Sequence, residues 1–473
     1  MMECFYRREG IVLNLFYLDA HNHTEFSNTN GFLDSTIKVK ELITRAYELG
    51  YKGIAITDHA NISAHVQAVQ ITKDLKKSGK ISEDFKVVLG VEAYVVDEQE
   101  MTNNISENKP NRFYHMVILA TNEKGHEAIH KISTQSFLQS FTHRGVLRTP
   151  IFYHQLSELM KNFQKGDLII TTACLGGFMG QVVSNLINTS LETEQQQYKK
   201  DIYQFVCWAL DTFGEDNVFF ELQPSLMEEQ VAYNQMLVKI ANAYQIPYVV
   251  ATDTHYLNKE DRGVHEAFLT SDSGDTDREL GDFYDSTYLH SFEEFYEKMG
   301  YLGEEVITNA INNTKLIYDK CKEYDLYKNQ VIPKIPLPPK NEWGTYEELY
   351  QMAKGYKSIQ AMIDSPEPYD NYLINLAFKG MIDKGIPKEK YEEKLARIDI
   401  ECYELIGISK AKGQPISSYF ITMAKCVDLI WESGSIIGPS RGSCAGFELN
   451  YVLGISQVSP LEQGIEMPHW RSK

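Results

Sequence analysis

Residues 16–59, FYLDAHNHTEFSNTNGFLDSTIKVKELITRAYELGYKGIAITDH, contain the pattern that decides the fold. Apolar and β-branched residues favour strands at Phe16–His21 and Gly53–Thr57, and amphipathic spacing favours a helix at Thr36–Leu49 between them. Gly50 stands where such a helix is expected to stop. Two strands joined by a helix predict a parallel strand pair.

The same alternation of strands and helices continues to about residue 270. Further strand candidates are Lys86–Val96, Met116–Ala120, Asp167–Thr172, Asn217–Leu222 and Pro247–Thr252. Further amphipathic helix candidates are Glu123–Phe137, Tyr198–Phe213 and Glu228–Tyr244. Repeated alternation is typical of a parallel α/β sheet, and seven strand candidates predict a closed or nearly closed β/α barrel.

Potential metal ligands follow most of the predicted strands. They are His21, His23, Asp34, Asp58, His59, Glu92, His115, Cys174, Asp253 and His255. In a β/α barrel, the carboxyl ends of the strands gather on the face where functional groups converge. His115 fits this pattern less well because it precedes its strand candidate, and Asp34 lies in the loop after the first strand.

Each of these residues has a simpler explanation when it is taken alone. A histidine at a strand end is more often a hydrogen-bonded core residue, Asp58 could cap a helix, and Cys174 could be a small buried apolar side chain. The joint pattern favours a polynuclear metal centre, because His-x-His and Asp-x-His pairs put side chains on one side of an extended chain. Imidazole and thiolate favour zinc, whereas carboxylates leave manganese, iron and magnesium open. We therefore expect two or three divalent ions and metal-dependent phosphoester chemistry.

The chain is expected to divide near residue 285, after an acidic stretch at 271–284. Residues 1–285 would form the barrel. Residues 286–473 have mostly helical patterns, interrupted by an irregular Pro-rich connector at Ile332–Lys340.

A glycine motif, GPSRGS, occupies Gly438–Ser443. A short strand candidate at Ile436–Gly438 leads into it, and a helix candidate at Cys444–Leu453 follows it. Glycines let the backbone approach a phosphate closely, and N–H groups at a helix N-terminus favour anions. On its own the motif is equally consistent with a plain strand–turn–helix.

Composition limits the classes of function. The net charge of −19 opposes non-specific binding to a nucleic-acid backbone, so any contact with DNA should be local. No apolar run is long enough to span a bilayer, and we expect no membrane association. The seven cysteines are scattered and include no Cys-x-x-Cys pair, which favours a reducing, cytoplasmic location.

Several segments carry a family resemblance. They are DAHNHTEFSN, KELITRAYELGYKGIAITDH, VVLGVEAYVV, YHMVILATNEKG, ITTACLGG and PYVVATDTHYLNKED. They resemble the polymerase-and-histidinol-phosphatase (PHP) domain, and more narrowly the PHP domain at the N-terminus of bacterial DNA polymerase III alpha subunits. The segment YFITMAKCVDLIWESGSIIGPSRGSCAGFELNYVLGISQVSPLE resembles the first half of the palm of that family, so the resemblance covers about residues 17–465.

The resemblance implies a PHP-type (β/α)7 barrel followed by a largely helical, incomplete nucleotidyltransferase palm. It implies metal ligation by His21, His23, Asp34, His59, Glu92, His115, Cys174, Asp253 and His255. Asp58 would be a structural residue beside the ligands. PHP domains of this family with a complete ligand set resemble metal-dependent 3′–5′ exonucleases or phosphatases, and depleted ones resemble scaffolds.

The resemblance also assigns nucleotide-phosphate contacts to Gly438, Arg441, Gly442 and Ser443. Gly442 and Ser443 resemble the glycine–serine motif that holds the triphosphate of an incoming nucleotide, and Arg441 would be the charged contact. Ser440 departs from the pattern, because the family usually has Gly there.

A second departure is the absence of aspartate from Cys444 to Lys473, where the family has an Asp-x-Asp strand that holds two magnesium ions. The chain is therefore expected not to polymerise DNA alone and to be the N-terminal piece of a truncated or split polymerase, of phage or mobile-element origin. Expected partners are a DNA 3′ end, the remaining polymerase polypeptide, a sliding clamp or a proofreading exonuclease. Magnesium and dNTP binding are expected only with a complete palm.

Two other functions remain open on the sequence. The barrel could be a non-catalytic, metal-stabilised scaffold that docks an exonuclease or complements a split polymerase. It could also be a small-molecule PHP phosphatase, although that reading leaves residues 286–473 unexplained.

Overall fold

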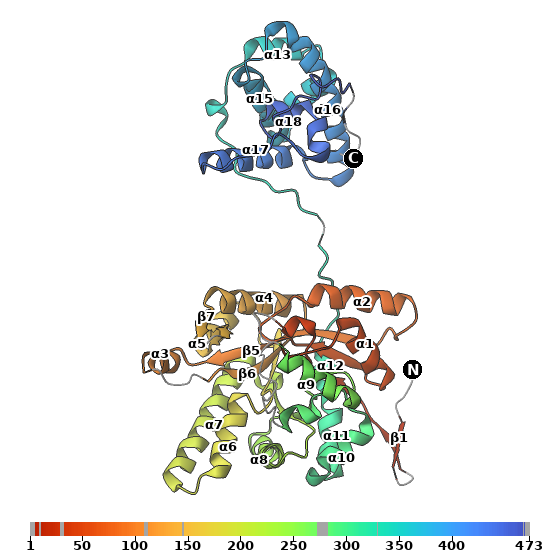
Figure 1. Ribbon diagram of the computed structural model, residues 1–473, viewed down its shortest axis with the longest axis vertical. Coiled ribbons are helices and arrows are strands. Elements are labelled where there is room, and N and C mark those ends of the chain that lie inside the picture. The colour runs from red at the N-terminus through yellow and green to blue at the C-terminus, as the bar shows by residue number, and fades with distance from the viewer. Residues whose placement is uncertain are drawn as a thin grey trace. The chain divides into compact units, whose positions relative to one another are not determined.

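The computed structural model describes residues 5–8, 11–28, 33–107, 112–143, 146–271, 282–328, 330–466 and 468 of the 473-residue chain. The chain forms two compact units, Met1–Tyr327 and Lys328–Lys473, and each has its own apolar core (Figure 1). Within the described ranges, no helix combines the length and the apolar content that a membrane crossing needs.

An eight-stranded mixed sheet forms the centre of the first unit. Seven strands follow one another as β3-β4-β5-β6-β10-β11-β12, and β9 pairs with β5. Their bounds are β3 Leu18–Asp19, β4 Gly53–Ile56, β5 Lys86–Val96, β6 Tyr114–Ala120, β9 Pro150–Phe152, β10 Leu168–Thr171, β11 Val218–Leu222 and β12 Tyr248–Val250. Separate hairpins pair β1 (Phe5–Arg8) with β2 (Ile11–Asn14) and β7 (Phe141–His143) with β8 (Val146–Arg148).

The sheet is nearly closed, which confirms the expected barrel-like α/β fold. Beyond the ends of β3 and β12, Asn22 and Thr254 form an isolated parallel bridge. The His23 N–H donates to the Thr254 carbonyl at 2.9 Å. The first and last strands therefore meet at their carboxyl ends, next to the histidines that follow them.

One strand runs against the expected direction. β6 pairs antiparallel with both of its neighbours, β5 and β10, whereas β3, β4, β5, β9, β10, β11 and β12 otherwise pair in parallel. The expectation of an all-parallel sheet was wrong for this strand. As a consequence, the start of β6 lies at the same edge of the sheet as the ends of its neighbours.

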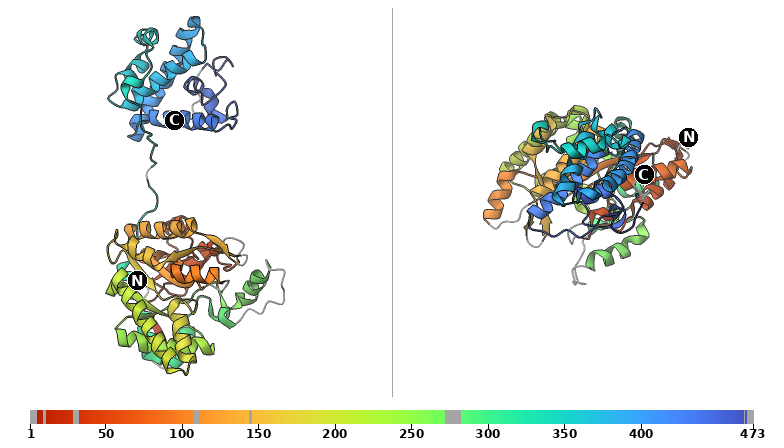
Figure 2. Two further views of the ribbon diagram at one scale, coloured as in Figure 1. Left: turned by 90° about the vertical axis from the view of Figure 1, so that its left-hand side faces the viewer. Right: turned by 90° about the horizontal axis from the view of Figure 1, so that it is seen from above.

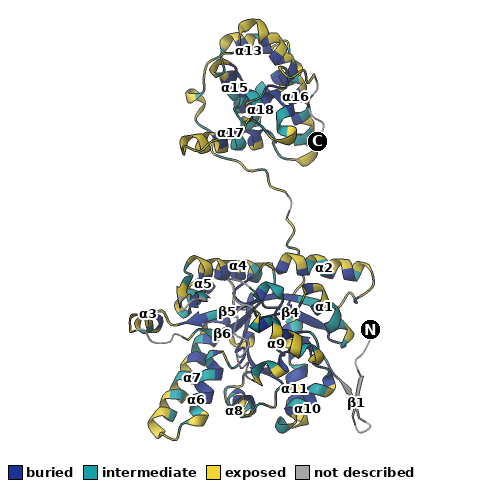
Figure 3. Cartoon of the chain, viewed as in Figure 1, coloured by how far each residue is buried: buried dark blue, intermediate teal, exposed yellow. Residues whose placement is uncertain are grey.

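Helices cover the outside of the sheet (Figures 1 and 2). Their bounds are α1 Val39–Glu48, α2 His65–Lys77, α3 Glu98–Ser106, α4 Glu123–Leu138, α5 Tyr153–Met160, α6 Phe178–Asn188, α7 Glu192–Phe213, α8 Glu228–Tyr244 and α9 Arg262–Thr270. In α1, buried Val39, Leu42, Ile43 and Ala46 follow the spacing of one helix face. Figure 3 shows the same division, with buried strands and exposed outer helix faces.

Three further helices belong to the first unit, namely α10 (Phe292–Met299), α11 (Glu304–Asn312) and α12 (Thr314–Lys320). The Phe295 ring packs edge-on against Tyr17 with centroids 5.0 Å apart, in the same apolar core as the strands. The first unit therefore extends to Tyr327, later than the expected boundary at 285. Residues 272–281 of the acidic stretch lie outside the described residues.

The second unit is helical. Its helices are α13 Glu347–Ala353, α14 Lys357–Ile363, α15 Pro368–Asp383, α16 Tyr391–Lys412, α17 Ser417–Glu432 and α18 Glu448–Val452. Helices α15 and α18 pack so closely that a Cβ atom on Gly380 would lie 1.7 Å from the Val452 carbonyl oxygen. In the Pro-rich connector, residues 332–339 have no regular structure, as expected, whereas Lys340 begins a short 3-10 turn, Lys340–Glu342.

The glycine motif differs from its expected surroundings. Ile436–Gly438 is not a strand, and residues 330–466 and 468 contain none. In place of one helix over Cys444–Leu453, a 3-10 turn at Gly442–Gly446 precedes the short α18. A strand needs a paired neighbour, and this unit offers none within the described residues.

Candidate metal centre

The carboxyl edge of the sheet brings the expected ligand residues together. His21 and His23 follow β3, His59 follows β4, Cys174 follows β10, and Asp253 and His255 follow β12. Glu92 lies within β5, and His115 lies near the start of β6. The reversed direction of β6 explains how His115 reaches the others although it precedes most of its strand.

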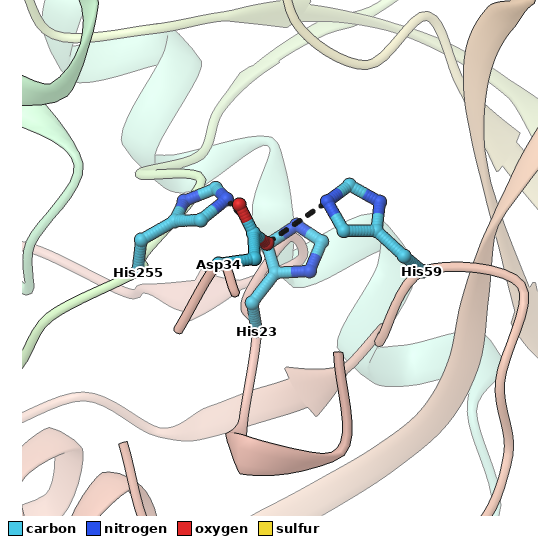
Figure 4. A group of neighbouring side chains, drawn as sticks. All are labelled: His23, Asp34, His59 and His255. Carbon is cyan, nitrogen blue, oxygen red and sulfur yellow. Dashed lines mark ion pairs between the residues drawn. The ribbon is translucent and has the colours of Figure 1, made fainter. Parts of the chain in front are cut away.

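Four side chains form the first group of neighbouring donors, His23, Asp34, His59 and His255 (Figure 4). Asp34 Oδ2 lies 3.0 Å from His59 Nε2 and 3.1 Å from His255 Nε2. The His23 ring lies tilted against both other rings, with centroids 4.2 and 4.4 Å away. One carboxylate oxygen and three imidazoles thus converge from three different loops.

His23 also belongs to the second group, with His21 and Asp253. Asp253 Oδ1 lies 3.2 Å from the Nε2 atoms of both histidines, and those two nitrogens lie 3.2 Å from each other. All three side chains are buried.

The third group contains His59, Glu92 and His115. Glu92 Oε2 lies 2.6 Å from His59 Nδ1, and Glu92 Oε1 lies 2.8 Å from His115 Nδ1. Cys174 Sγ lies 3.6 Å from the same His115 nitrogen, so the thiol adjoins this group without being one of its close donors.

The three donor groups together are called the pocket below. Several of their donor atoms have no hydrogen-bond partner. They are Asp34 Oδ2, His59 Nδ1, Glu92 Oε2 and Asp253 Oδ1. His59 Nδ1 and Glu92 Oε2 are only 2.6 Å apart, yet they are not aligned for a hydrogen bond. Buried polar atoms are rarely left unpaired. Four unpaired oxygen and nitrogen atoms in neighbouring groups are what coordination of shared cations would explain. The donor set and its geometry therefore fit divalent metal ions.

The charges of the pocket favour a cation. Burial disfavours the protonated form of His21, but nearby carboxylates, Asp253 first among them, raise its pKa well above the usual value. Burial and the adjacent imidazoles lower the pKa of His23 to about 3. Burial opposes the ionisation of Asp34, but adjacent imidazoles hold the pKa of that carboxyl well below its usual range. The carboxylates therefore carry negative charge that a metal ion can neutralise.

Backbone strain is concentrated at this edge of the sheet. Four described non-glycine residues have positive φ, and they include Ala60 (48°), Ala173 (54°) and Asp253 (49°). Ala60 follows His59, and Ala173 precedes Cys174. Such conformations cost free energy and tend to occur at functional sites, so this clustering agrees with a functional pocket.

Asp58 faces away from these groups. Its Oδ1 accepts hydrogen bonds from the Thr24 N–H at 2.6 Å and from the Ser27 hydroxyl at 2.8 Å. The Ser27 hydroxyl also lies 3.0 Å from His23 Nδ1. Asp58 therefore fixes the turn that carries His23.

Three residues that the sequence analysis did not single out adjoin the pocket, namely Tyr94, Glu221 and Gln223. The Tyr94 ring stacks on His59 at 5.5 Å, with an interplanar angle of 14°. Glu221 Oε1 lies 2.7 Å from His21 Nδ1. The signal for Glu221 was its charge within the apolar run VFFEL, since a buried carboxylate needs a partner.

The glycine motif lies in the second unit and is open to solvent. Gly438, Arg441, Gly442 and Ser443 are all exposed, and Gly442 has a φ of 56°. A Cβ atom on either glycine would meet no neighbour within 4 Å. The loop therefore has room for a ligand, and the described structure contains no contact that assigns one.

Family models match both units. The PHP domain matches residues 19–225, and the bacterial DNA polymerase III alpha NTPase domain matches residues 371–471. Asp253 and His255 follow the first matched range but face the same pocket.

Whole-chain relatives are polymerases. A DNA-directed DNA polymerase of Bacillus phage SPbeta is 37% identical over 468 residues, which cover 96% of this chain and 35% of that protein. The DNA polymerase III subunit alpha of Aquifex aeolicus (strain VF5) is 29% identical over 465 residues, 95% of this chain and 34% of that protein. The chain is a homologue of the DNA polymerase III alpha subunits. The same subunit of Helicobacter pylori (strain J99) is 28% identical over 460 residues.

This polymerase III alpha homologue spans about a third of the length of the curated relatives that it matches. The two matched domains lie in the two compact units, with the PHP domain in the first and the NTPase domain in the second.

Proposed function

We propose that the first unit is a divalent-metal-dependent phosphoesterase that removes nucleotides from DNA 3′ ends, in a replication protein of the polymerase III alpha type. The observation that supports this most strongly is the set of unpaired buried donor atoms in the pocket. Homology to polymerases favours DNA over a small molecule as the substrate.

The proposed metal ligands are the residues that converge at the pocket: His21, His23, Asp34, His59, Glu92, His115, Cys174, Asp253 and His255. Three overlapping donor groups support two or three ions. Mixed imidazole and carboxylate donors are compatible with zinc, manganese, iron or magnesium. When bound, such ions would neutralise phosphoryl oxygens and lower the pKa of a coordinated water.

The proposed substrate approaches from the side of His115 and His59. The His115 side chain is 26% exposed and that of His59 10%, whereas His21, His23 and Glu92 are fully buried. The Tyr94 ring packs against both imidazoles, with centroids 5.5 Å from His59 and 5.1 Å from His115. The net charge of −19 disfavours extended contact with DNA, which fits recognition of a strand end at the pocket.

For the whole protein, we propose a role in DNA synthesis. Gly438, Arg441, Gly442 and Ser443 would then contact the phosphates of a nucleotide. Magnesium, dNTP, a sliding clamp and a proofreading exonuclease belong to this wider proposal.

A nuclease assay tests the proposal. The purified protein is incubated with Mn²⁺ or Zn²⁺ and a single-stranded DNA oligonucleotide labelled at its 5′ end. We expect progressive shortening from the 3′ end, which a chelator or His23→Ala abolishes. His154→Ala is the matched control, because that side chain is 61% exposed and belongs to none of the three donor groups.

The same assay separates the other functions. Hydrolysis of p-nitrophenyl phosphate without DNA shortening would indicate a small-molecule phosphatase. Tight metal binding with neither reaction would indicate a scaffold.

A further inference from the structure

Glu221 is a fully buried carboxylate that lies beneath the pocket on β11. Its Oε1 lies 2.7 Å from His21 Nδ1, and its Oε2 accepts a hydrogen bond from the Thr171 hydroxyl at 2.5 Å. Both oxygens are therefore used, and the carboxylate is held in one orientation.

This contact fixes which nitrogen of His21 faces the pocket. A carboxylate can only accept, so Nδ1 carries the proton that it shares with Glu221. Nε2 then points at the donor group, 3.2 Å from Asp253 Oδ1 and 3.3 Å from Glu92 Oε1. A carboxylate behind an imidazole also increases the basicity of the nitrogen that binds a metal.

Gln223 links Glu221 to Asp253. Its side-chain Nε2 donates to Glu221 Oε1 at 3.2 Å and to Asp253 Oδ2 at 3.3 Å. Asp253 Oδ2 is thereby occupied, and Oδ1 is the oxygen left without a partner in the pocket. One amide therefore sets the orientation of Asp253 relative to His21.

The other two donor groups contain none of these contacts. Asp34 lies closest to His59 and His255, and neither Glu221 nor Gln223 contacts it. Glu92 lies closest to His59 and His115, at 2.6 and 2.8 Å, and its distance to His21 Nε2 is longer, at 3.3 Å. The effect of the two residues should therefore be strongest at the group of His21, His23 and Asp253.

We propose that Glu221 and Gln223 are positioning residues that orient His21 and Asp253 for one metal ion of the centre. This inference rests on the proposed function, since it assumes that the centre binds divalent ions. It adds two residues to the centre and assigns them to a single ion.

The test is metal titration of the complete chain after removal of metal, with Mn²⁺ and Zn²⁺ as probes. Glu221→Gln keeps an oxygen that can accept from Nδ1, whereas Glu221→Leu keeps none. We expect one ion to bind about 10-fold more weakly in Glu221→Gln and about 100-fold more weakly in Glu221→Leu, with the other ions unchanged. Gln223→Leu should weaken the same ion, and Glu229→Gln, which changes an exposed carboxylate, should have no effect.

Two further measurements separate positioning from a structural role. In the zinc-loaded protein, the Nδ1–H proton of His21 should give a strongly downfield resonance that Glu221→Leu removes. The increase in Tm on addition of metal should be smaller in Glu221→Gln than in the wild type. A purely structural role would instead lower the Tm of the metal-free and the metal-loaded protein by the same amount. Unchanged binding of every ion in both Glu221 variants would overturn the inference. A wild-type protein that binds no metal would instead overturn the proposed function.

Discussion

At the scale of single residues, the pocket differs from an ordinary buried polar cluster in where its donor atoms point. His23 shows this best, because its Nε2 lies within 3.4 Å of Glu92 Oε2 and 3.2 Å of Asp253 Oδ1. It also belongs to two of the three donor groups. A single imidazole therefore borders two candidate ion positions.

We predict that His23→Ala loses at least one bound metal ion per chain. The reason is that the variant removes a donor from two of the three groups. The group of His59, Glu92 and His115 keeps all its donors. Elemental analysis of protein saturated with Zn²⁺ measures the change, and His154→Ala should keep the wild-type content. Equal metal content in wild type and His23→Ala would contradict the assignment.

A second residue-scale prediction concerns Asp58. Asp58→Ala leaves the buried Thr24 N–H and the Ser27 hydroxyl without their acceptor. An unsatisfied buried donor costs about 1–3 kcal/mol, so the free energy of unfolding should fall by about that amount. Urea denaturation measures it. Asp211→Ala, on the exposed face of α7, should stay within about 0.5 kcal/mol of wild type, and a similar loss in both variants would refute the role of Asp58.

The sequence predicted which residues lie together at the pocket but not which other side chains hold them in position. Ligand types after apolar runs were enough to place His21, His59 and Asp253 on one edge. Glu221 was not predicted, because a single charge inside an apolar strand does not reveal which side chain it faces across the barrel.

At the scale of elements, local patterns predicted the strands well and their direction less well. β5 has the bounds that the sequence predicted, Lys86–Val96, and β6 starts two residues earlier than Met116. The antiparallel direction of β6 was not predicted, because a buried apolar run does not reveal whether the strand runs parallel or antiparallel to its neighbours. This direction brings His115 to the pocket.

Local sequence patterns also did not reveal that the first compact unit continues to Tyr327. Helices α10–α12 read as one more helical run, like those of the second unit. Aromatic contacts between α10 and Tyr17, which is remote in sequence, place α10 in the core of the first unit.

An element-scale prediction follows from the packing of α15 on α18. Gly380→Ala places a methyl group 1.7 Å from the Val452 carbonyl oxygen, so the two helices must separate and the second unit should be strongly destabilised. Gly407→Ala is the matched control, since Gly407 lies within α16 with no atom near its added Cβ. It should stabilise the protein by about 0.5–1 kcal/mol, because alanine favours helix. Guanidinium unfolding measures both, and equal stabilities would show that the close approach is absent.

At the scale of the whole molecule, the candidate metal ligands lie in the first unit and the glycine motif lies in the second. The two units have separate apolar cores, so ligand effects on stability should also be separate.

We predict that a chelator lowers the melting temperature of the first unit and leaves that of the second unchanged. A ligand at 100 times its Kd stabilises the folded state by about 2.7 kcal/mol, and its removal takes that increment away. Scanning calorimetry with and without added Zn²⁺ measures the two transitions. A chelator that shifts both transitions equally, or neither, would count against a metal centre confined to the barrel.

The most direct measurement is a crystal structure of the protein loaded with Mn²⁺ or Zn²⁺, with anomalous scattering recorded at the absorption edge of the metal. The account predicts anomalous peaks between Asp34 Oδ2 and its histidines, and between Asp253 Oδ1 and His21, in the pocket at the carboxyl edge of the sheet. No peak there in fully loaded crystals, or peaks only at surface side chains, would contradict it.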